Sequence, residues 1–171
     1  MEFIPTFFAE IGVPVTVMLR FKSDLAREMA AEKNAIYADQ GWDFNMIDVG
    51  GELYRNFRKF LSEKRLLITV FDGFDNWQLN HKSEKAVFSG KEILLDSTPK
   101  RLHSLTGKGS VFYISMIRKG GEYHLNVEEI EAPNSEGLPS NIFNKWSKSV
   151  LDNPNQWYIW DEVDELFEQE A

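Results

Sequence analysis

Short apolar runs alternate with helix-favouring stretches in the first part of the chain. Three runs are rich in β-branched or aromatic residues and short enough to be buried strands: residues 13–21, 44–49 and 66–71. Between them, residues 25–40 are rich in Ala, Glu, Met and Lys, which favour a helix, and residues 52–64 carry an apolar stripe at helical spacing with charged residues on the other side. Strands that alternate with helices in this way pair in parallel, so the pattern predicts a β-α-β-α-β unit.

Signals for helix ends support this reading. Residues 3–11 have apolar positions at helical spacing, and Gly12 stands where such a helix would stop. Ser23 or Asp24 can cap the helix that follows, because either side chain can accept a hydrogen bond from the free N–H groups of a first turn.

The clearest pattern lies at residues 111–130. Residues 111–117 are apolar at nearly every position, which predicts a strand buried on both faces. Lys119-Gly120-Gly121 supplies a tight turn, because glycine tolerates the positive φ that such turns need. The following residues alternate, with Tyr123, Leu125 and Val127 on one side and polar residues on the other. An antiparallel hairpin with one solvent-exposed face is expected.

The remaining segments complete the fold prediction. Residues 75–89 are polar and are expected to form a loop, 91–95 a short strand and 98–105 a short helix; 132–139 reads as a linker. Helices are expected over 140–151 and 156–169. The predicted fold class is α/β: a mixed sheet with a parallel start, a C-terminal β-hairpin and flanking helices, in a single domain of residues 1–171.

Composition excludes several classes of protein. The chain has 171 residues, of which 43% are hydrophobic, so a packed core is expected. A net charge of -8 argues against a nucleic-acid binder, because phosphate contacts need clustered Lys and Arg. The absence of cysteine excludes disulfides and thiolate metal sites and fits the cytoplasm. No run of 18 apolar residues occurs, so no transmembrane segment is expected.

Two charged residues follow predicted parallel strands at matching ends. Asp72 ends the strand at 66–71, and Arg20 lies at the end of the first strand. Ligands of open α/β sheets bind outside the carboxyl ends of the strands, although a charged residue there can also simply mark a strand boundary. None of the three histidines has a partner at metal-ligand spacing, so no metal site is predicted.

Four segments, in their order along the chain, resemble the later two thirds of the lipid A late acyltransferase family, within the lysophospholipid acyltransferase superfamily. The first is similar to the family's gly-x-pro-val strand and ends in Arg20 (residues 11–20), and the second is similar to its apolar strand ending in aspartate, here Asp72 (66–73). The third, Val87-Phe88-Ser89-Gly90, is similar to the family's phe-x-gly segment. The fourth is similar to the family's arginine-ended strand, here ending in Arg118, with its return strand and the later pro-x-gln-aromatic-x-trp segment (111–133 and 153–160). The resemblance spans nearly the whole chain.

The resemblance implies a function in acyl transfer. Members of the family move an acyl chain from a thioester, carried on coenzyme A or acyl carrier protein, to a hydroxyl or amine, and hold no cofactor permanently. Five positions are carried over as candidate substrate-binding residues: Arg20, Asp72, Phe88, Gly90 and Arg118.

This chain departs from the family at its catalytic motif. The family's His-x4-Asp/Glu motif precedes the gly-x-pro-val strand and is absent here. His124 and Glu129 lie in a predicted strand, where an i, i+5 pair points to opposite faces, so they are rejected as a catalytic pair. No catalytic residue is predicted, and loss of a general base costs on the order of 10²–10⁴ in rate. The expectation is a split, degenerate or truncated acyltransferase-like chain that is inactive without a companion chain.

The charge of the last segment leaves an alternative open. Asp161, Glu162 and Asp164 follow Trp160 where the family has basic residues, which removes attraction for anionic lipid. A cytoplasmic protein is expected, with a peripheral position at the inner membrane as a second possibility. The alternative function is an acidic non-enzymatic binding protein, such as an immunity protein or inhibitor, that acts on a basic partner.

Overall fold

The structure of the chain is a computed structural model, which describes residues 3–19, 21, 23–48, 53–69, 82–96, 98–106, 109–131 and 135–156. The chain divides into two compact units, Met1–Val70 and Phe71–Ala171. The single domain expected from the chain length stays a prediction.

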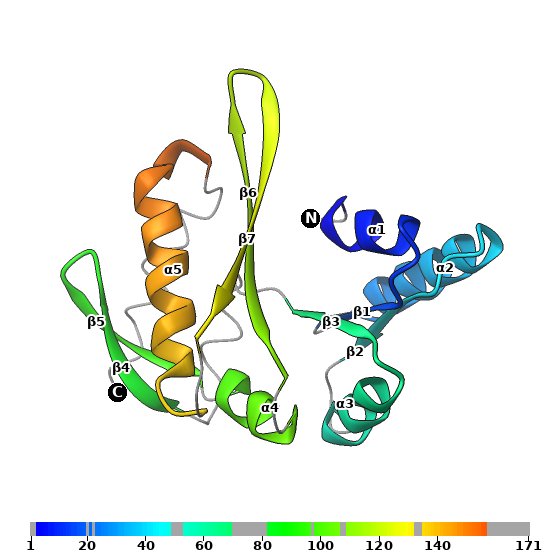
Figure 1. The fold of residues 1–171 in the computed structure, drawn as a ribbon, viewed down its shortest axis with the longest axis horizontal. Helices are drawn as coiled ribbons and strands as arrows, with labels where there is room; N and C mark the ends of the chain where they lie inside the picture. Colours follow the sequence, from blue (N-terminus) through cyan, green and yellow to red (C-terminus); the bar gives the residue numbers. More distant parts are fainter. Residues whose placement is uncertain are drawn as a thin grey trace. The chain divides into compact units, whose positions relative to one another are not determined.

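Unit 1 is built on a parallel sheet of three strands. The order is β2-β1-β3, with β1 (Val15–Leu19) paired in parallel to β2 (Phe44–Asp48) and to β3 (Leu66–Thr69). Helix α2 (Asp24–Asp39) lies between β1 and β2 in the chain, and α3 (Leu53–Ser62) lies between β2 and β3 (Figure 1). The predicted β-α-β-α-β unit is confirmed.

The first helix and the cap of the second also agree with the sequence. Helix α1 (Phe3–Glu10) ends before Gly12, which has a φ of 84°. Ser23 is the N-cap of α2, and its hydroxyl accepts a hydrogen bond of 3.2 Å from the backbone N–H of Ala26.

One face of this sheet forms the core of unit 1. Alternate residues of the strands meet there with α1, around the buried side chains Ala9, Val15, Val17 and Phe44. Tyr37 of α2 stacks on Trp42, with ring centroids 5.4 Å apart. On α3, Phe57 and Phe60 are buried while Arg58 and Lys59 are exposed, as the apolar stripe of this helix predicts.

In its described residues, unit 2 contains two antiparallel hairpins and two α-helices. The first hairpin pairs β4 (Lys82–Phe88) with β5 (Lys91–Asp96), and the second pairs β6 (Val111–Lys119) with β7 (Glu122–Ile130). Helix α4 (Thr98–Thr106) separates them in the chain. Helix α5 (Leu138–Asp152) follows β7, and a 3-10 turn (Pro154–Gln156) comes next.

One predicted element of this unit is wrong, and another lies outside the described residues. The loop expected over 75–89 is wrong for residues 82–88, because these residues form β4. Most positions of β4 are charged or polar, so the sequence of this strand lacks the apolar alternation that predicts a strand. In the structure Lys85 of β4 pairs across the hairpin with Glu92. Apart from Gln156, the helix expected over 156–169 lies outside the described residues.

Helix α5 organises unit 2. It contacts β4, β5, β6, β7 and α4, and in Figure 1 it runs between the two hairpins. Its buried residues are Leu138, Pro139, Phe143, Trp146 and Val150. Phe88 of β4 packs against two of them, with ring centroids 6.3 Å from Phe143 and 5.1 Å from Trp146.

The second hairpin has the predicted turn but not the predicted burial. Gly120 and Gly121 both have positive φ, at 58° and 91°. Residues 111–117, however, are not buried on both faces, since Phe112 is 49% and Met116 37% exposed. A uniformly apolar strand shows only that both faces can be buried, and within the described residues α5 lies against one face.

Candidate functional site

The carboxyl ends of β1, β2 and β3 share one edge of the sheet in unit 1. Leu19 is opposite Asp48, and Met18 is opposite Thr69, so the three strands end at nearly the same level. Arg20 directly follows β1 in the sequence, and Asp72 comes three residues after Thr69. Both candidate residues lie outside the described part of the chain, so their position at this edge stays a prediction.

A carboxylate that sequence reasoning did not single out lies at this edge. Asp48 is the last residue of β2, and its carboxylate Oδ2 is 3.3 Å from Nε of Arg27 on α2. The same guanidinium binds Asp24 through Nη1 at 2.6 Å. Asp48 could have been found by the rule that singled out Asp72, a charged residue at the end of an apolar run.

An arginine whose side chain is largely buried lies at the opposite edge of the sheet. Arg65 immediately precedes β3, and its side chain is only 9% exposed. It donates hydrogen bonds to the hydroxyl of Thr16 at 2.8 Å, the backbone carbonyl of Val15 at 2.8 Å and the carboxylate of Asp43 at 2.5 Å. Because these groups belong to β1 and to the residue before β2, Arg65 joins the amino ends of all three strands.

Phe88 and Gly90 belong to the hairpin β4–β5. The side chain of Phe88 is 1% exposed and fills the core beside α5. Gly90 and Ser89 both have positive φ and form the turn between the strands. Phe88 therefore has a place in the core of unit 2 and Gly90 in a turn, and their contact with a ligand stays a prediction.

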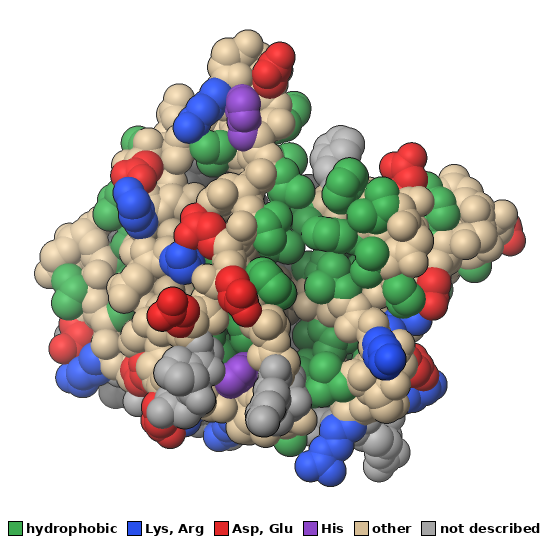
Figure 2. Space-filling view, viewed as in Figure 1, with side chains coloured by type: hydrophobic (Ala, Val, Ile, Leu, Met, Phe, Trp, Pro, Cys, Tyr) green, Lys and Arg blue, Asp and Glu red, His purple; other side chains and the backbone are tan. Residues whose placement is uncertain are grey.

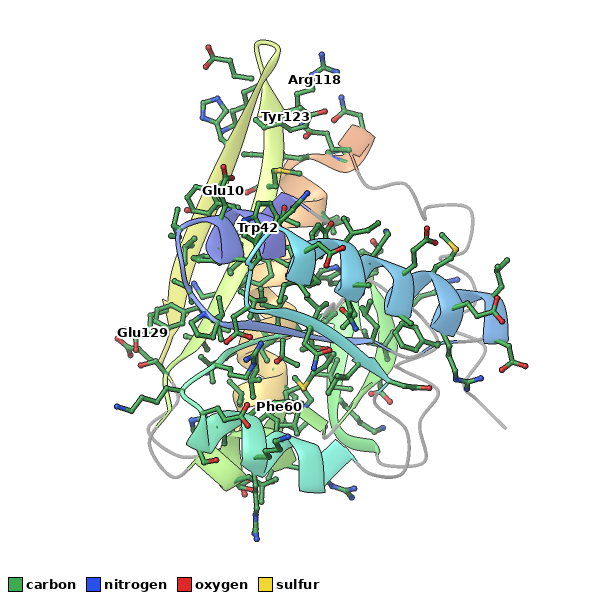
Figure 3. The ribbon with its side chains drawn as sticks, turned by 90° about the vertical axis from the view of Figure 1, so that its right-hand side faces the viewer. Glu10, Trp42, Phe60, Arg118, Tyr123 and Glu129 are labelled. Carbon is green, nitrogen blue, oxygen red and sulfur yellow. The ribbon has the colours of Figure 1, made fainter. Side chains whose placement is uncertain are left out.

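Arg118 is exposed near the tip of the other hairpin. Its guanidinium carbon lies 5.8 Å from the ring centroid of Tyr123, the residue opposite it on β7. Figure 3 shows the two side chains near the tip. Within unit 2, Phe88 and Gly90 thus lie on one hairpin and Arg118 on the other, with α5 between the hairpins (Figure 1).

Ionisable groups lie where α5 meets β6–β7. Burial raises the pKa of Tyr113, and a hydrogen bond with Ser149 opposes that change. Hydrogen bonds from Lys145 and Asn126 lower the pKa of Glu128, which lies on the exposed part of β7. The ion pair with Asp152 raises the pKa of Lys148. The contacts of Tyr113 with Ser149 and of Glu128 with Lys145 join the hairpin to α5, whereas Lys148 and Asp152 pair within α5.

Other candidate chemistry is limited in the described residues. His124 and Glu129 lie on opposite faces of β7, as their spacing predicts. Within the described ranges, no group of three or more His, Asp or Glu side chains could hold a metal ion. Nδ1 of His103 on α4 lies 3.1 Å from the hydroxyl of Ser135, which precedes α5. This contact ties α4 to the start of α5.

Comparisons with models of protein families and with curated proteins find no match to this chain. Among the described residues, no helix combines the length and apolar character needed to cross a membrane.

Proposed function

We propose that the chain is an acyltransferase-type domain that binds an acyl thioester, on coenzyme A or acyl carrier protein, without transferring the acyl group alone. One observation supports this above the others. β1 and β3 are neighbouring parallel strands, and each is followed in the sequence by a candidate ligand residue, Arg20 or Asp72. In open α/β sheets, ligands bind outside the carboxyl ends of such strands.

The side chains of Arg20 and Asp72 suit the binding of an acyl thioester. An arginine can bind the phosphates of coenzyme A or of the carrier protein's prosthetic group through paired N–H donors. A carboxylate at the same edge can orient this guanidinium or accept a hydrogen bond from the amides of the pantetheine arm. Asp48 and Arg27 form an ion pair at the same edge.

Transfer itself needs a general base, which no candidate in this chain supplies. A companion chain that brings a histidine and a carboxylate to the same edge would complete the reaction. The histidine would then take the proton of the acceptor hydroxyl or amine as that group attacks the thioester carbonyl.

Tryptophan fluorescence titration tests the proposal, with an acyl-CoA as the ligand and free coenzyme A as the reference. Acyl-CoA should bind more tightly, and Arg20→Ala or Asp72→Asn should weaken binding about tenfold each, the effect of a lost charge-assisted contact. Arg58→Ala removes an exposed arginine of α3 and is the matched control. Equal affinity for acyl-CoA and coenzyme A would contradict the proposal.

The alternative, an acidic binding protein that acts on a basic partner, rests on the acidic run at residues 161–165, which lies outside the described residues.

A further inference from the structure

The hairpin β6–β7 carries an apolar face that the described chain leaves exposed. Residues opposite one another on the two strands share a face, so this face consists of Phe112, Ile114, Met116, Arg118, Tyr123, Leu125, Val127 and Glu129. The exposed fractions are 49% for Phe112, 41% for Leu125, 47% for Val127 and 67% for Tyr123. Figure 2 shows apolar side chains along the hairpin below its charged tip.

The other face of the hairpin is the one held by α5. Lys145 of α5 forms an ion pair with Glu128, and Tyr113 is hydrogen-bonded to Ser149. Both hairpin residues belong to the face that also carries the buried Ile130. The exposed apolar face therefore points away from α5.

The two charged groups of the apolar face lie at its opposite ends. Arg118 is on β6 near the tip, and Glu129 is on β7 near the base, with apolar pairs at the two levels between them. Figure 3 shows Arg118 close to the tip and Glu129 farther down the hairpin. An apolar centre with opposite charges at its two ends is complementary to a copy of itself turned end for end.

We infer that this face binds the same face of a second copy of the chain. The two hairpins would pack as a small sandwich about 10 Å apart, related by a twofold axis that runs across the strands. This axis brings Arg118 of each copy to the level of Phe112 and Glu129 of the other. The contact then contains two equivalent ion pairs, one at each end of an apolar centre.

The size and charge of the chain set the expected strength. Each strand has nine residues, or about 30 Å, and the two strands together are about 10 Å wide. The face therefore covers on the order of 300 Å², below the roughly 800 Å² per partner of a standard interface. The net charge of -8 on each copy also opposes association, although salt screens it. A weak dimer with a dissociation constant of roughly 10–500 μM is expected.

Sedimentation equilibrium of the full chain over about 5 μM to 1 mM, in 0.15 M salt, tests the inference directly. Val127→Lys should raise the dimer dissociation constant at least about tenfold, because an unpaired ammonium would lie in an apolar contact. Val87→Lys is the matched control: Val87 is 66% exposed on β4, and its substitution should leave the dimer unchanged. The mass of a single chain at every concentration would overturn the inference.

A charge-reversal experiment tests the end-for-end arrangement. Arg118→Glu places two carboxylates together at each end of the contact, and Glu129→Arg places two guanidinium groups together. Either variant alone should dimerise about tenfold more weakly, while a mixture of the two should form heterodimers about as tight as the original dimer. A mixture that dimerises no more tightly than the separate variants would overturn the end-for-end arrangement. A dimer that Val127→Lys and Val87→Lys weaken equally would overturn the assignment of the contact to this face.

Discussion

The side-chain amide of Gln156 pairs with the backbone of Arg118 like a short piece of neighbouring strand. Its Oε1 accepts a hydrogen bond from the N–H of Arg118 at 2.6 Å, and its Nε2 donates one to the carbonyl of the same residue at 3.0 Å. Both backbone groups lie on the edge of β6 that does not pair with β7. Gln156 thus satisfies polar groups that an open strand edge would otherwise present to another chain.

Replacing Gln156 with Ala should therefore loosen β6 locally. The backbone amide of Arg118 should exchange its hydrogen about tenfold faster, as expected when one hydrogen bond of about 1 kcal/mol or more is lost. Hydrogen exchange followed by NMR measures this change. Asn155→Ala, at the exposed neighbouring position, is the control and should leave the Arg118 amide unchanged.

Asn34 has the same role on unit 1. Its Oδ1 accepts a hydrogen bond from the N–H of Met46 at 2.7 Å, and its Nδ2 donates one to the carbonyl of Met46 at 3.0 Å. Met46 lies on β2, an edge strand of the sheet. Asn34→Ala should lower the free energy of unfolding by about 1–3 kcal/mol, because two part-buried backbone groups lose their partner. Urea denaturation measures this, with the exposed Glu32→Ala on the same helix as the control.

Arg65 should be the most sensitive polar residue of unit 1 among those described. Arg65→Met should lower the free energy of unfolding by about 3 kcal/mol, because it removes hydrogen bonds that join three strand ends and leaves the fully buried Thr16 hydroxyl without this donor. Arg58→Met, on the exposed side of α3, should change stability by less than about 0.5 kcal/mol. Equal effects of the two substitutions would contradict the role assigned to Arg65.

Tyr113 should make stability depend on pH in the alkaline range. Burial raises its folded-state pKa above the ordinary value of 10.0, so the unfolded chain releases this proton first as the pH rises. The contribution of Tyr113 is therefore fully present below pH 10 and is lost as the pH rises toward the folded-state pKa. Denaturation of the wild type and Tyr113→Phe at several pH values measures it. The stability advantage of the wild type should shrink above pH 10, and a constant difference would contradict the assignment.

Local pattern was enough to predict most of the fold. The strands of unit 1 are predictable because short β-branched runs alternate with helix-favouring stretches, and the hairpin at 111–130 because two glycines separate two strand patterns. β4 was missed because charged residues at 82, 84 and 85 break the apolar pattern that marks a strand. Two of these charges find partners outside the segment: Lys85 pairs with Glu92 of β5, and Glu84 accepts a hydrogen bond from Ser140 of α5.

Contacts between distant residues could not be predicted from pattern. The pairs Asn34–Met46, Arg65–Thr16 and Gln156–Arg118 join residues 12, 49 and 38 positions apart. The apolar residues of β6 do not predict which face of the strand α5 covers, and the sequence around Phe88 does not predict that this side chain is buried in the core. Arg20 and Asp72 were placed by their position after predicted strands. The strands are confirmed, and the placement of these two side chains stays a prediction.

Equilibrium dialysis of the full chain against a radiolabelled acyl thioester tests the proposed function most directly, with the thioester bond followed by chromatography. The protein should retain the acyl-CoA, a tenfold excess of unlabelled acyl-CoA should displace it, and the same excess of coenzyme A should displace it far less. The thioester should stay intact throughout, because the proposed function assigns no general base to this chain. The account would be contradicted if the protein retained acyl-CoA no better than it retains coenzyme A. It would also be contradicted if the chain alone transferred the acyl group.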